Sequence, residues 1–260
     1  MYKHRRETIR SIINSQPFTS FKELEARFPN ISSMTIRRDV EYFQNKGEVV
    51  KVRGGARSVK FMLTSMDETF DKRRSENVVE KHVIAHAAVN LLESGKNIFL
   101  DSGTTVLTMA SMIPDKRFNV TTNCPYIALE LLKNPKVIIN IIGGTLNRTD
   151  LSISGVQANK FIDSSNFDIS FIAPTGFSEY SGFTTGNWAE GEVKKHIVKN
   201  SQKVVALLDS SKFNKSMPYT FADLSDISVV VCDSVPPDRI LELFKESGVE
   251  LIIANEVKNS

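Results

Sequence analysis

The stretch from Ser32 to Val40 constrains this chain more than any other part of its sequence. It begins with hydroxyl residues that suit a helix N-terminus, and it continues with apolar side chains on one side and polar or basic side chains on the other. A helix of this kind fits the major groove of DNA. We expect Met34, Ile36, Val40 and Phe43 to pack inward, and Ser33, Thr35, Arg37 and Arg38 to contact DNA.

A short basic hairpin is predicted directly after this helix. In the run from Lys51 to Arg57, a valine precedes the pair Gly54-Gly55, and an arginine stands on either side of the turn. The β-branched residue favours a strand, and the glycine pair permits a tight turn. We expect Lys51, Arg53 and Arg57 to contact backbone phosphates.

Two further helices are predicted before the basic one. Residues 4–15 carry isoleucines at helical spacing, which indicates a packing helix. Ser20 and Glu23 form a capping box at the start of a second, shorter helix. Three helices joined by short turns and followed by a hairpin predict a winged helix-turn-helix domain over residues 1–58.

The motifs of this region resemble those of the DeoR family of bacterial transcriptional regulators. Thr35-Ile36-Arg37-Arg38-Asp39 matches the family's recognition-helix signature, and Arg53-Gly54-Gly55-Ala56 stands where the family usually has His-Gly-Gly-Ala. The change from histidine to arginine keeps the tip of the hairpin cationic. The resemblance implies a regulator of a carbohydrate-utilisation operon that binds double-stranded operator DNA, with repression as the expected mode.

The charge of the chain is divided unevenly between its two ends. Residues 1–60 hold 13 Lys and Arg against 6 Asp and Glu, a net charge of +7, whereas the remaining 200 residues have a net charge of −4. A basic surface confined to one end is typical of nucleic-acid binding, although a merely solvated basic surface is the alternative. Because one such domain covers few base pairs, we expect the protein to bind DNA as a homo-oligomer.

Several other classes of protein are disfavoured by the sequence. No segment is long and apolar enough to span a membrane, and no secretory signal follows the charged N-terminus, so we expect a cytoplasmic protein. Cys124 and Cys232 have neither metal-binding nor redox spacing. His82 and His86 are four residues apart on a predicted helix but lack further ligands nearby, so we expect no metal and no cofactor.

Residues 59–77 are interpreted as a linker between two domains. The segment 67–74 is charged around one aromatic residue, a composition typical of a solvated connector. Phe61-Met62-Leu63 could instead pair with the hairpin or with a partner subunit. The second domain then comprises residues 78–260.

Short apolar runs alternate with helical stretches throughout residues 78–260. Apolar runs without polar alternation indicate strands covered on both faces, so this domain is predicted to be a parallel α/β sheet. The predicted strands are residues 97–100, 118–121, 137–142, 168–173, 203–208, 227–231 and 251–253, and the predicted helices include 80–94, 125–132, 189–200 and 237–247.

Small, hydroxyl and amide residues follow the predicted strands, where an open α/β sheet binds its ligands. The run Asp101-Ser102-Gly103-Thr104-Thr105 suits a phosphate through its glycine, its hydroxyls and the N–H groups of the helix that follows. It has neither the spacing of a P-loop nor a dinucleotide-binding fingerprint. These turns predict a polar pocket, although each also fits an ordinary strand-to-helix turn. The later turns are Thr121-Thr122-Asn123, Gly143-Gly144-Thr145, Thr175-Gly176 and Asp209-Ser210-Ser211-Lys212.

The same motifs, together with Glu192-Val193-Lys194, resemble the DeoR-type sensor domain. That domain is similar in fold to ribose-5-phosphate isomerase and CoA transferases, and in the family it usually senses a phosphorylated sugar. The resemblance implies that Ser102, Thr104 and Thr105 hold the phosphate. It also implies that the sugar end faces Asp101, Asn123, Glu192 and Lys212, and Gly103, Thr122, Gly143 and Gly144 complete the expected effector site.

An enzyme that isomerises a sugar phosphate on this fold is the alternative function. Such chemistry needs a positioned base and a cation or donor for the enediolate oxygen, for which Asp101, Glu192, Lys194 and Lys212 are the candidates. The isomerases carry an acid-rich Asp-Gly-Ala-Asp-Glu turn where this chain has Ala173-Pro174-Thr175-Gly176-Phe177. Because those carboxylates are missing, we expect no catalytic residues and no enzyme activity.

Overall fold

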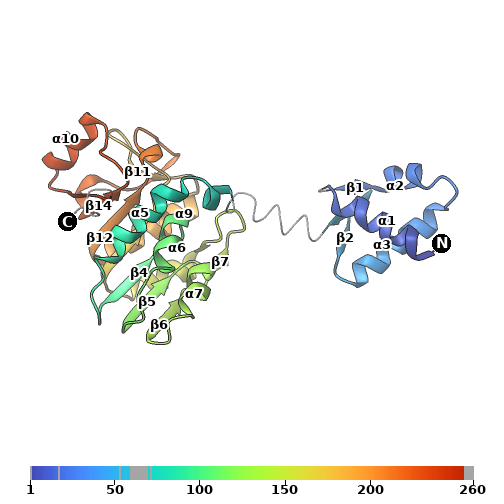
Figure 1. Cartoon of the computed structure of the whole chain (residues 1–260), viewed down its shortest axis with the longest axis horizontal. Coiled ribbons are helices and arrows are strands. Elements are labelled where there is room, and N and C mark those ends of the chain that lie inside the picture. The colour runs from blue at the N-terminus through green and yellow to red at the C-terminus, as the bar shows by residue number, and fades with distance from the viewer. Residues whose placement is uncertain (1, 17, 53, 59–69, 71, 255–260) are drawn as a thin grey trace. The chain divides into compact units, whose positions relative to one another are not determined.

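The computed structural model describes residues 2–16, 18–52, 54–58, 70 and 72–254, and the chain divides into two compact units, Met1–Thr69 and Phe70–Ser260 (Figure 1). The predicted fold class is confirmed, because a small helical unit precedes a parallel α/β unit. The second unit begins earlier than predicted, since residues 70–77 belong to it rather than to a connector. The predicted pairing of Phe61-Met62-Leu63 concerns residues outside the described ranges.

The N-terminal unit packs three helices on a small antiparallel sheet. Isoleucines of the first helix contact Phe21 and Leu24 of the second and Ile36, Val40 and Phe43 of the third in one buried cluster. Met34 is the exception to the predicted packing, because its side chain is 62% exposed. The elements are α1 (Tyr2–Asn14), β1 (Thr19–Ser20), α2 (Phe21–Arg27), α3 (Ser33–Asn45), β2 (Val49–Val52) and β3 (Gly55–Ser58), with the strand order β1-β3-β2.

Local contacts explain where these elements begin. The Ser20 hydroxyl accepts a hydrogen bond from the N–H of Glu23 at the start of α2, which is one half of the predicted capping box, and the Glu23 carboxylate accepts from the side-chain amide of Gln16. The turn between β2 and β3 needs glycine twice. Gly54 has φ +88°, and a Cβ on Gly55 would lie 2.2 Å from the carbonyl oxygen of Thr19.

A seven-stranded parallel sheet forms the centre of the second unit. Its strand order is β15-β14-β12-β9-β4-β5-β6, and the predicted apolar runs supply all seven strands. The chain order therefore reverses between β4 and β9, the arrangement at which open α/β sheets hold their ligands. The strands are β4 (Asn97–Leu100), β5 (Phe118–Thr122), β6 (Val137–Ile141), β9 (Phe167–Ile172), β12 (Ser201–Leu208), β14 (Val229–Cys232) and β15 (Glu250–Ile253).

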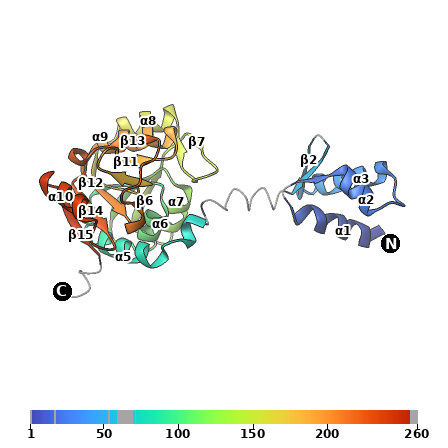
Figure 2. The same ribbon diagram turned by 90° about the horizontal axis from the view of Figure 1, so that it is seen from above.

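Helices cover both faces of this sheet, which is why most of its strands contain uninterrupted apolar runs. Residues of α5, α6 and α7 share one buried cluster with one face, and residues of α8, α9 and α10 share a second cluster with the other. Figure 2 shows α5 and α6 on one side of the sheet and α8 and α9 on the other. The helices are α5 (Val78–Val89), α6 (Thr104–Ala110), α7 (Pro125–Leu131), α8 (Val156–Asp163), α9 (Trp188–Lys199) and α10 (Asp238–Glu246).

Smaller elements complete this unit and were not predicted from the sequence. Strands β10 (Gly176–Ser178), β11 (Gly182–Thr185) and β13 (Tyr219–Ala222) form a three-stranded antiparallel sheet, and β7 (Thr145–Leu146) pairs with β8 (Ile153–Ser154). Short helical turns occur at Ser210–Lys212 and Leu224–Asp226. Within the described residues, no helix combines the length and the apolar character needed to cross a bilayer.

Candidate functional site

The outer face of α3 carries the polar and basic residues that the sequence predicts to contact DNA. Ser33, Arg37 and Arg38 are exposed. The guanidinium carbon of Arg37 lies 4.3 Å from the centre of the Phe21 ring, so a cation–π contact orients this side chain. Thr35 is only half-buried, and its hydroxyl lies 2.9 Å from that of Ser32, the N-cap residue of α3.

The hairpin contributes Lys51, whose side chain is exposed. Lys51 lies on β2, and its backbone N–H donates to the side-chain oxygen of Gln44 on α3, which joins the hairpin to the helix. Arg57 belongs to β3 and pairs across the hairpin with Val50. The predicted contact from Arg53 concerns a residue outside the described ranges.

Asp39, next to the two exposed arginines, has a structural role. Its carboxylate is buried and accepts from Nε of Arg5 at 2.7 Å and from Nε of Arg6 at 2.8 Å. Both arginines lie on α1, so this cluster fixes α1 against the helix that carries Arg37 and Arg38. In the motif Arg37-Arg38-Asp39, the two arginines therefore point to solvent and Asp39 supports the packing of the helices.

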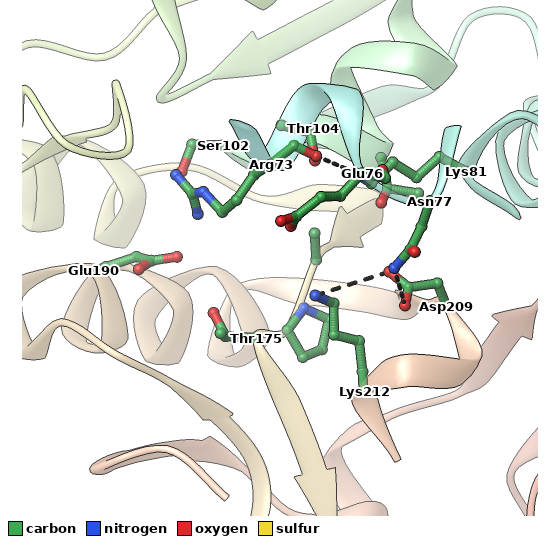
Figure 3. A pocket seen from close by; sticks show the side chains of 14 residues that line it. Arg73, Glu76, Asn77, Lys81, Ser102, Thr104, Thr175, Glu190, Asp209 and Lys212 are labelled. Carbon is green, nitrogen blue, oxygen red and sulfur yellow. Dashed lines mark hydrogen bonds and ion pairs between the residues drawn. The ribbon is translucent and has the colours of Figure 1, made fainter. Parts of the chain in front are cut away.

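A polar pocket lies at the carboxyl edge of the large sheet, at the point where the strand order reverses. Its walls come from the segments after β4, β9 and β12, together with residues 73–81 (Figure 3). The lining residues are Arg73, Glu76, Asn77, Lys81, Ser102, Gly103, Thr104, Thr105, Ala173, Pro174, Thr175, Glu190, Asp209 and Lys212.

Three cationic side chains line this pocket, which suits it to an anion. Arg73 and Lys81 come from residues N-terminal to the sheet, and Lys212 follows β12, 3.9 Å from the Asp209 carboxylate. Burial lowers the pKa of Lys81, although the charge of Asp209 acts in the opposite direction. Figure 3 shows Lys212 across the pocket from Arg73 and Thr104. Hydroxyl groups of Ser102, Thr104 and Thr105 add hydrogen-bond donors.

A buried charge cluster lies behind the pocket wall. The Lys194 ammonium, completely buried, donates to the Asp101 carboxylate and lies 3.2 Å from a carboxylate oxygen of Glu190. Burial opposes the charge of Lys194, but the two carboxylates more than offset it, so the pKa of Lys194 is raised. Thr185 donates its hydroxyl hydrogen to Glu190 at 2.6 Å. This cluster ties the start of α9 to the end of β4.

Some predicted site residues lie beneath the pocket rather than on its wall. Asp101, Thr122 and Asn123 are completely buried, and the Thr122 hydroxyl donates to the carbonyl of Leu100. The Asn123 side-chain amide lies 3.4 Å from the Ser102 hydroxyl. One side-chain oxygen of Asp101 and one of Asn123 have no hydrogen-bond partner within the described residues. Buried acceptors of this kind are costly unless a donor reaches them.

Three other predicted residues do not line the pocket. Gly143 and Gly144 follow β6, which is two strands away from β4, and adjacent strands are about 4.8 Å apart. Glu192 faces away from the pocket and pairs with Lys195 at 2.9 Å. The reason is helical phase, because Glu190 and Lys194 are one turn apart on the inner face of α9 and Glu192 lies between them on the outer face.

The sequence interpretation missed five charged or polar lining residues, which are Arg73, Glu76, Asn77, Lys81 and Glu190. Arg73, Glu76 and Asn77 fell in the predicted linker, and no apolar periodicity marks that segment. Lys81 looked like an ordinary charged residue of a helix, but it is buried. Trp188, whose role the sequence left open, is 61% exposed and does not line the pocket.

The described residues contain no cluster of three or more His, Cys, Asp or Glu that could hold a metal ion. His82 and His86 are both exposed on α5.

Known proteins match both units. A family model described as the DeoR C-terminal sensor domain matches residues 76–234, and one described as a DeoR-like helix-turn-helix domain matches residues 5–61. An uncharacterized HTH-type transcriptional regulator of Haemophilus influenzae is 31% identical over 250 residues, 96% of either chain. The HTH-type transcriptional regulator GlpR of Haloferax volcanii is 31% identical and covers 85% of this chain and 86% of its own.

Two further comparisons are more distant. The HTH-type transcriptional repressor GlcR of Bacillus subtilis is 26% identical and covers 87% of this chain and 86% of its own. Among solved structures, ribose 5-phosphate isomerase A of Methanocaldococcus jannaschii aligns with 51% of this chain and 53% of its own, at 16% identity and a TM-score of 0.38. A structural similarity of this size carries no argument about function.

Proposed function

The chain belongs to the DeoR family of transcriptional regulators, and from this premise we propose that it is the repressor of a carbohydrate-utilisation operon whose DNA binding a phosphorylated sugar controls. The helix-turn-helix unit binds DNA, and the α/β unit is the sensor domain. The proposal concerns the contacts that each unit makes and the ligand that the sensor domain takes.

The proposed DNA interface is the outer face of α3 together with the hairpin. Ser33, Arg37 and Arg38 supply groove contacts, and Lys51 supplies a phosphate contact, because these side chains are exposed on adjoining elements. Arginine at this position suits a bidentate contact with guanine. Thr35 supports the interface from the N-terminus of the helix.

The proposed effector site is the pocket at the reversal of the strand order. The observation that carries this proposal is the position of Lys81 and Lys212 beside the hydroxyls of Ser102 and Thr104. Cations and hydroxyl donors of this kind match a phosphate group. Gly143, Gly144 and Glu192 have no part in this site.

A thermal-shift screen of phosphorylated sugars tests the ligand class. A ligand present at a hundred times its dissociation constant is expected to add about 2.7 kcal/mol to the stability of the sensor domain. Thr104→Asp places a carboxylate in the pocket and is expected to abolish this effect through charge repulsion, whereas Thr108→Asp, one turn further along α6, should preserve it. Lys212→Ala is expected to weaken binding of the ligand. If Thr104→Asp responds at the wild-type ligand concentration, the site is misplaced.

The DNA interface is tested with a double variant. In the double variant Arg37→Ala, Arg38→Ala, the free energy of binding to the operator is expected to become less favourable by about 1–3 kcal/mol or more. Fluorescence anisotropy with a selected operator duplex measures this change. Unchanged binding by the folded double variant would rule out this surface.

We also propose that the protein acts as a homodimer or a larger assembly, because one helix-turn-helix unit covers too few base pairs for high specificity. Sedimentation at micromolar concentration, with and without operator DNA, is expected to show an oligomer. A monomer under both conditions contradicts the proposal.

Enzyme activity is the less favoured function. The segment after β9, Ala173-Pro174-Thr175, carries no carboxylate that could act as a base in the pocket. The Glu190 carboxylate is already held by Lys194 and Thr185. Turnover of a sugar phosphate by the purified protein would overturn this conclusion.

A further inference from the structure

One wall of the pocket is formed by the residues through which the chain enters the sensor domain. Arg73, Glu76 and Asn77 line the pocket, and they follow directly on the segment that connects to the DNA-binding domain. We call residues 72–77 the strap. Residues 72–75 of the strap are helical, and the N–H of Glu76 donates to the carbonyl of Lys72 at 3.0 Å.

Lys81 anchors two backbone carbonyls of the strap to the sensor domain, and Arg73 and Asn77 anchor it further through their side chains. The Lys81 ammonium donates to the backbone carbonyls of Arg73 and Glu76, the latter at 2.6 Å. Thr104 contacts the same Arg73 carbonyl at 3.5 Å. At the other end of the strap, the Asn77 side chain donates to the Asp209 carboxylate and to Ser211, both at 3.1 Å.

Lys81 differs from the other buried lysine of this domain in what neutralises it. Lys194 has two carboxylates within ion-pair distance, whereas within the described residues Lys81 has none, and its ammonium is satisfied by neutral carbonyls. Hydrogen bonds to an ionised acceptor are roughly twice as strong as those to a neutral one. An anion that enters the pocket therefore offers Lys81 a better partner than the strap does.

The strap also carries a negative charge into the same pocket. The Glu76 side chain is about half exposed, lines the pocket and has Lys72 as an ion-pair partner at 3.9 Å. Figure 3 shows its carboxylate extending into the space between Thr104 and Lys212. A phosphate group bound there repels this carboxylate.

We propose that the strap couples effector binding to the DNA-binding domain: the phosphate of the effector takes the Lys81 ammonium from the carbonyls of Arg73 and Glu76, repels the Glu76 carboxylate, and so releases residues 72–77. The inference rests on the proposed effector site. It adds a physical connection, because the segment that loses its anchor is the one that continues toward the operator-binding residues. A ligand shifts a conformational equilibrium only through contacts that differ between the two states, and Lys81 supplies such a contact.

Hydrogen exchange of the full chain tests this inference. The probes are inorganic phosphate, ribose 5-phosphate, glucose 6-phosphate and sorbitol 6-phosphate, each checked first for a rise in melting temperature. With a probe that stabilises the protein, amide exchange in residues 72–77 is expected to accelerate on the order of tenfold, while the strands of the sheet become better protected. Stabilisation without faster exchange in the strap overturns the inference and leaves the effector site intact. If no phosphorylated compound stabilises the protein, the effector site and the strap fail together.

Two variants separate the anchor from the ligand contacts. Lys81→Met is expected to show fast amide exchange in the strap without any ligand. The matched variant Lys212→Met removes another pocket cation. It should weaken binding of the probe but leave strap exchange in the free protein at its wild-type rate. Equal strap exchange in the free Lys81→Met and wild-type proteins refutes the anchor. Glu76→Gln keeps Lys81 and removes the repelled charge, so it is expected to bind the same probe roughly threefold more tightly. Unchanged or weaker binding by Glu76→Gln also counts against the inference.

Discussion

In the DNA-binding domain, Arg37 and Arg38 are exposed on α3 while their neighbour Asp39 is buried between two arginines; in the sensor domain, Lys194 is completely buried between Asp101 and Glu190. The arginines beside Asp39 are still 16% and 20% exposed, whereas Lys194 and Asp101 are not exposed at all. The difference indicates that Asp39 and Lys194, which hold the fold, are paired and withdrawn from water, whereas the arginines that α3 offers to DNA stay exposed to it. The effect of removing a charge should therefore follow its burial.

The largest effect is expected at Lys194. Lys194→Met leaves two buried carboxylates without their cation, which should destabilise the sensor domain by about 3–5 kcal/mol. Chemical denaturation followed by the fluorescence of Trp188, the one tryptophan of the chain, measures this domain directly. Lys195→Met, on the exposed face of α9, is the control and should change stability by less than about 0.5 kcal/mol. A loss below about 1 kcal/mol for Lys194→Met would break the comparison.

A smaller effect is expected at Asp39. Asp39→Asn keeps the shape of the side chain but removes the charge between Arg5 and Arg6, so the DNA-binding domain should lose about 1.5–3 kcal/mol. Far-ultraviolet circular dichroism follows its unfolding while Trp188 reports the sensor domain separately. Glu41→Gln, exposed on the same helix, serves as the matched control. A change in the Trp188 transition instead of the helical one would contradict the assignment of Asp39.

Loss of a charge offered to DNA should leave stability unchanged. Lys51→Ala is expected to weaken binding to every DNA sequence by a similar factor and to reduce the slope of log affinity against log salt by about 1. Titrations at several salt concentrations, with operator and unrelated duplexes, measure both quantities. Weaker binding to the operator alone would assign Lys51 to base recognition.

The smallest effect is expected at Glu192. Because it pairs with Lys195 on the exposed face of α9, Glu192→Gln should alter stability by less than about 0.5 kcal/mol and leave the response to effector unchanged. Melting curves with and without the phosphorylated sugar that stabilises the wild-type protein measure both. If the variant lost the ligand-induced rise in melting temperature, Glu192 would belong to the effector site.

The large sheet could be predicted well because a strand that is buried on both faces is marked in the sequence by a short run of apolar residues. Five of the seven parallel strands contain a run of three or more apolar residues, whereas β5 and β9 are interrupted by polar residues such as Asn119 and Ser170. The sheet of β10, β11 and β13 carries no such mark, since its strands mix single aromatic residues with Gly, Ser and Thr, and Tyr219–Ala222 is distant in sequence from the other two. Pairing between distant segments is decided by tertiary packing.

The candidate site was predicted less completely, and the two reasons differ. For Glu190 a signal was present, because Glu190, Val193, Lys194 and Ile197 recur at the spacing of one helix face, and all four are buried. For Arg73 and Asn77 no signal exists, since a short charged segment looks the same whether it is solvated or lies against a pocket. Only the contacts of Lys81 and Asp209 with that segment reveal its place.

The three loops that supply most of the pocket are separate in sequence, yet each is mounted on its own strand of one rigid sheet. Insertions and substitutions are tolerated in such loops far more readily than in the strands beneath them. The specificity of the sensor can thus be exchanged one loop at a time, with neither the hydrophobic core nor the operator-binding helix obliged to change. Changes confined to these loops would therefore allow a different ligand to control the same DNA site, whether they arise by engineering or by natural selection.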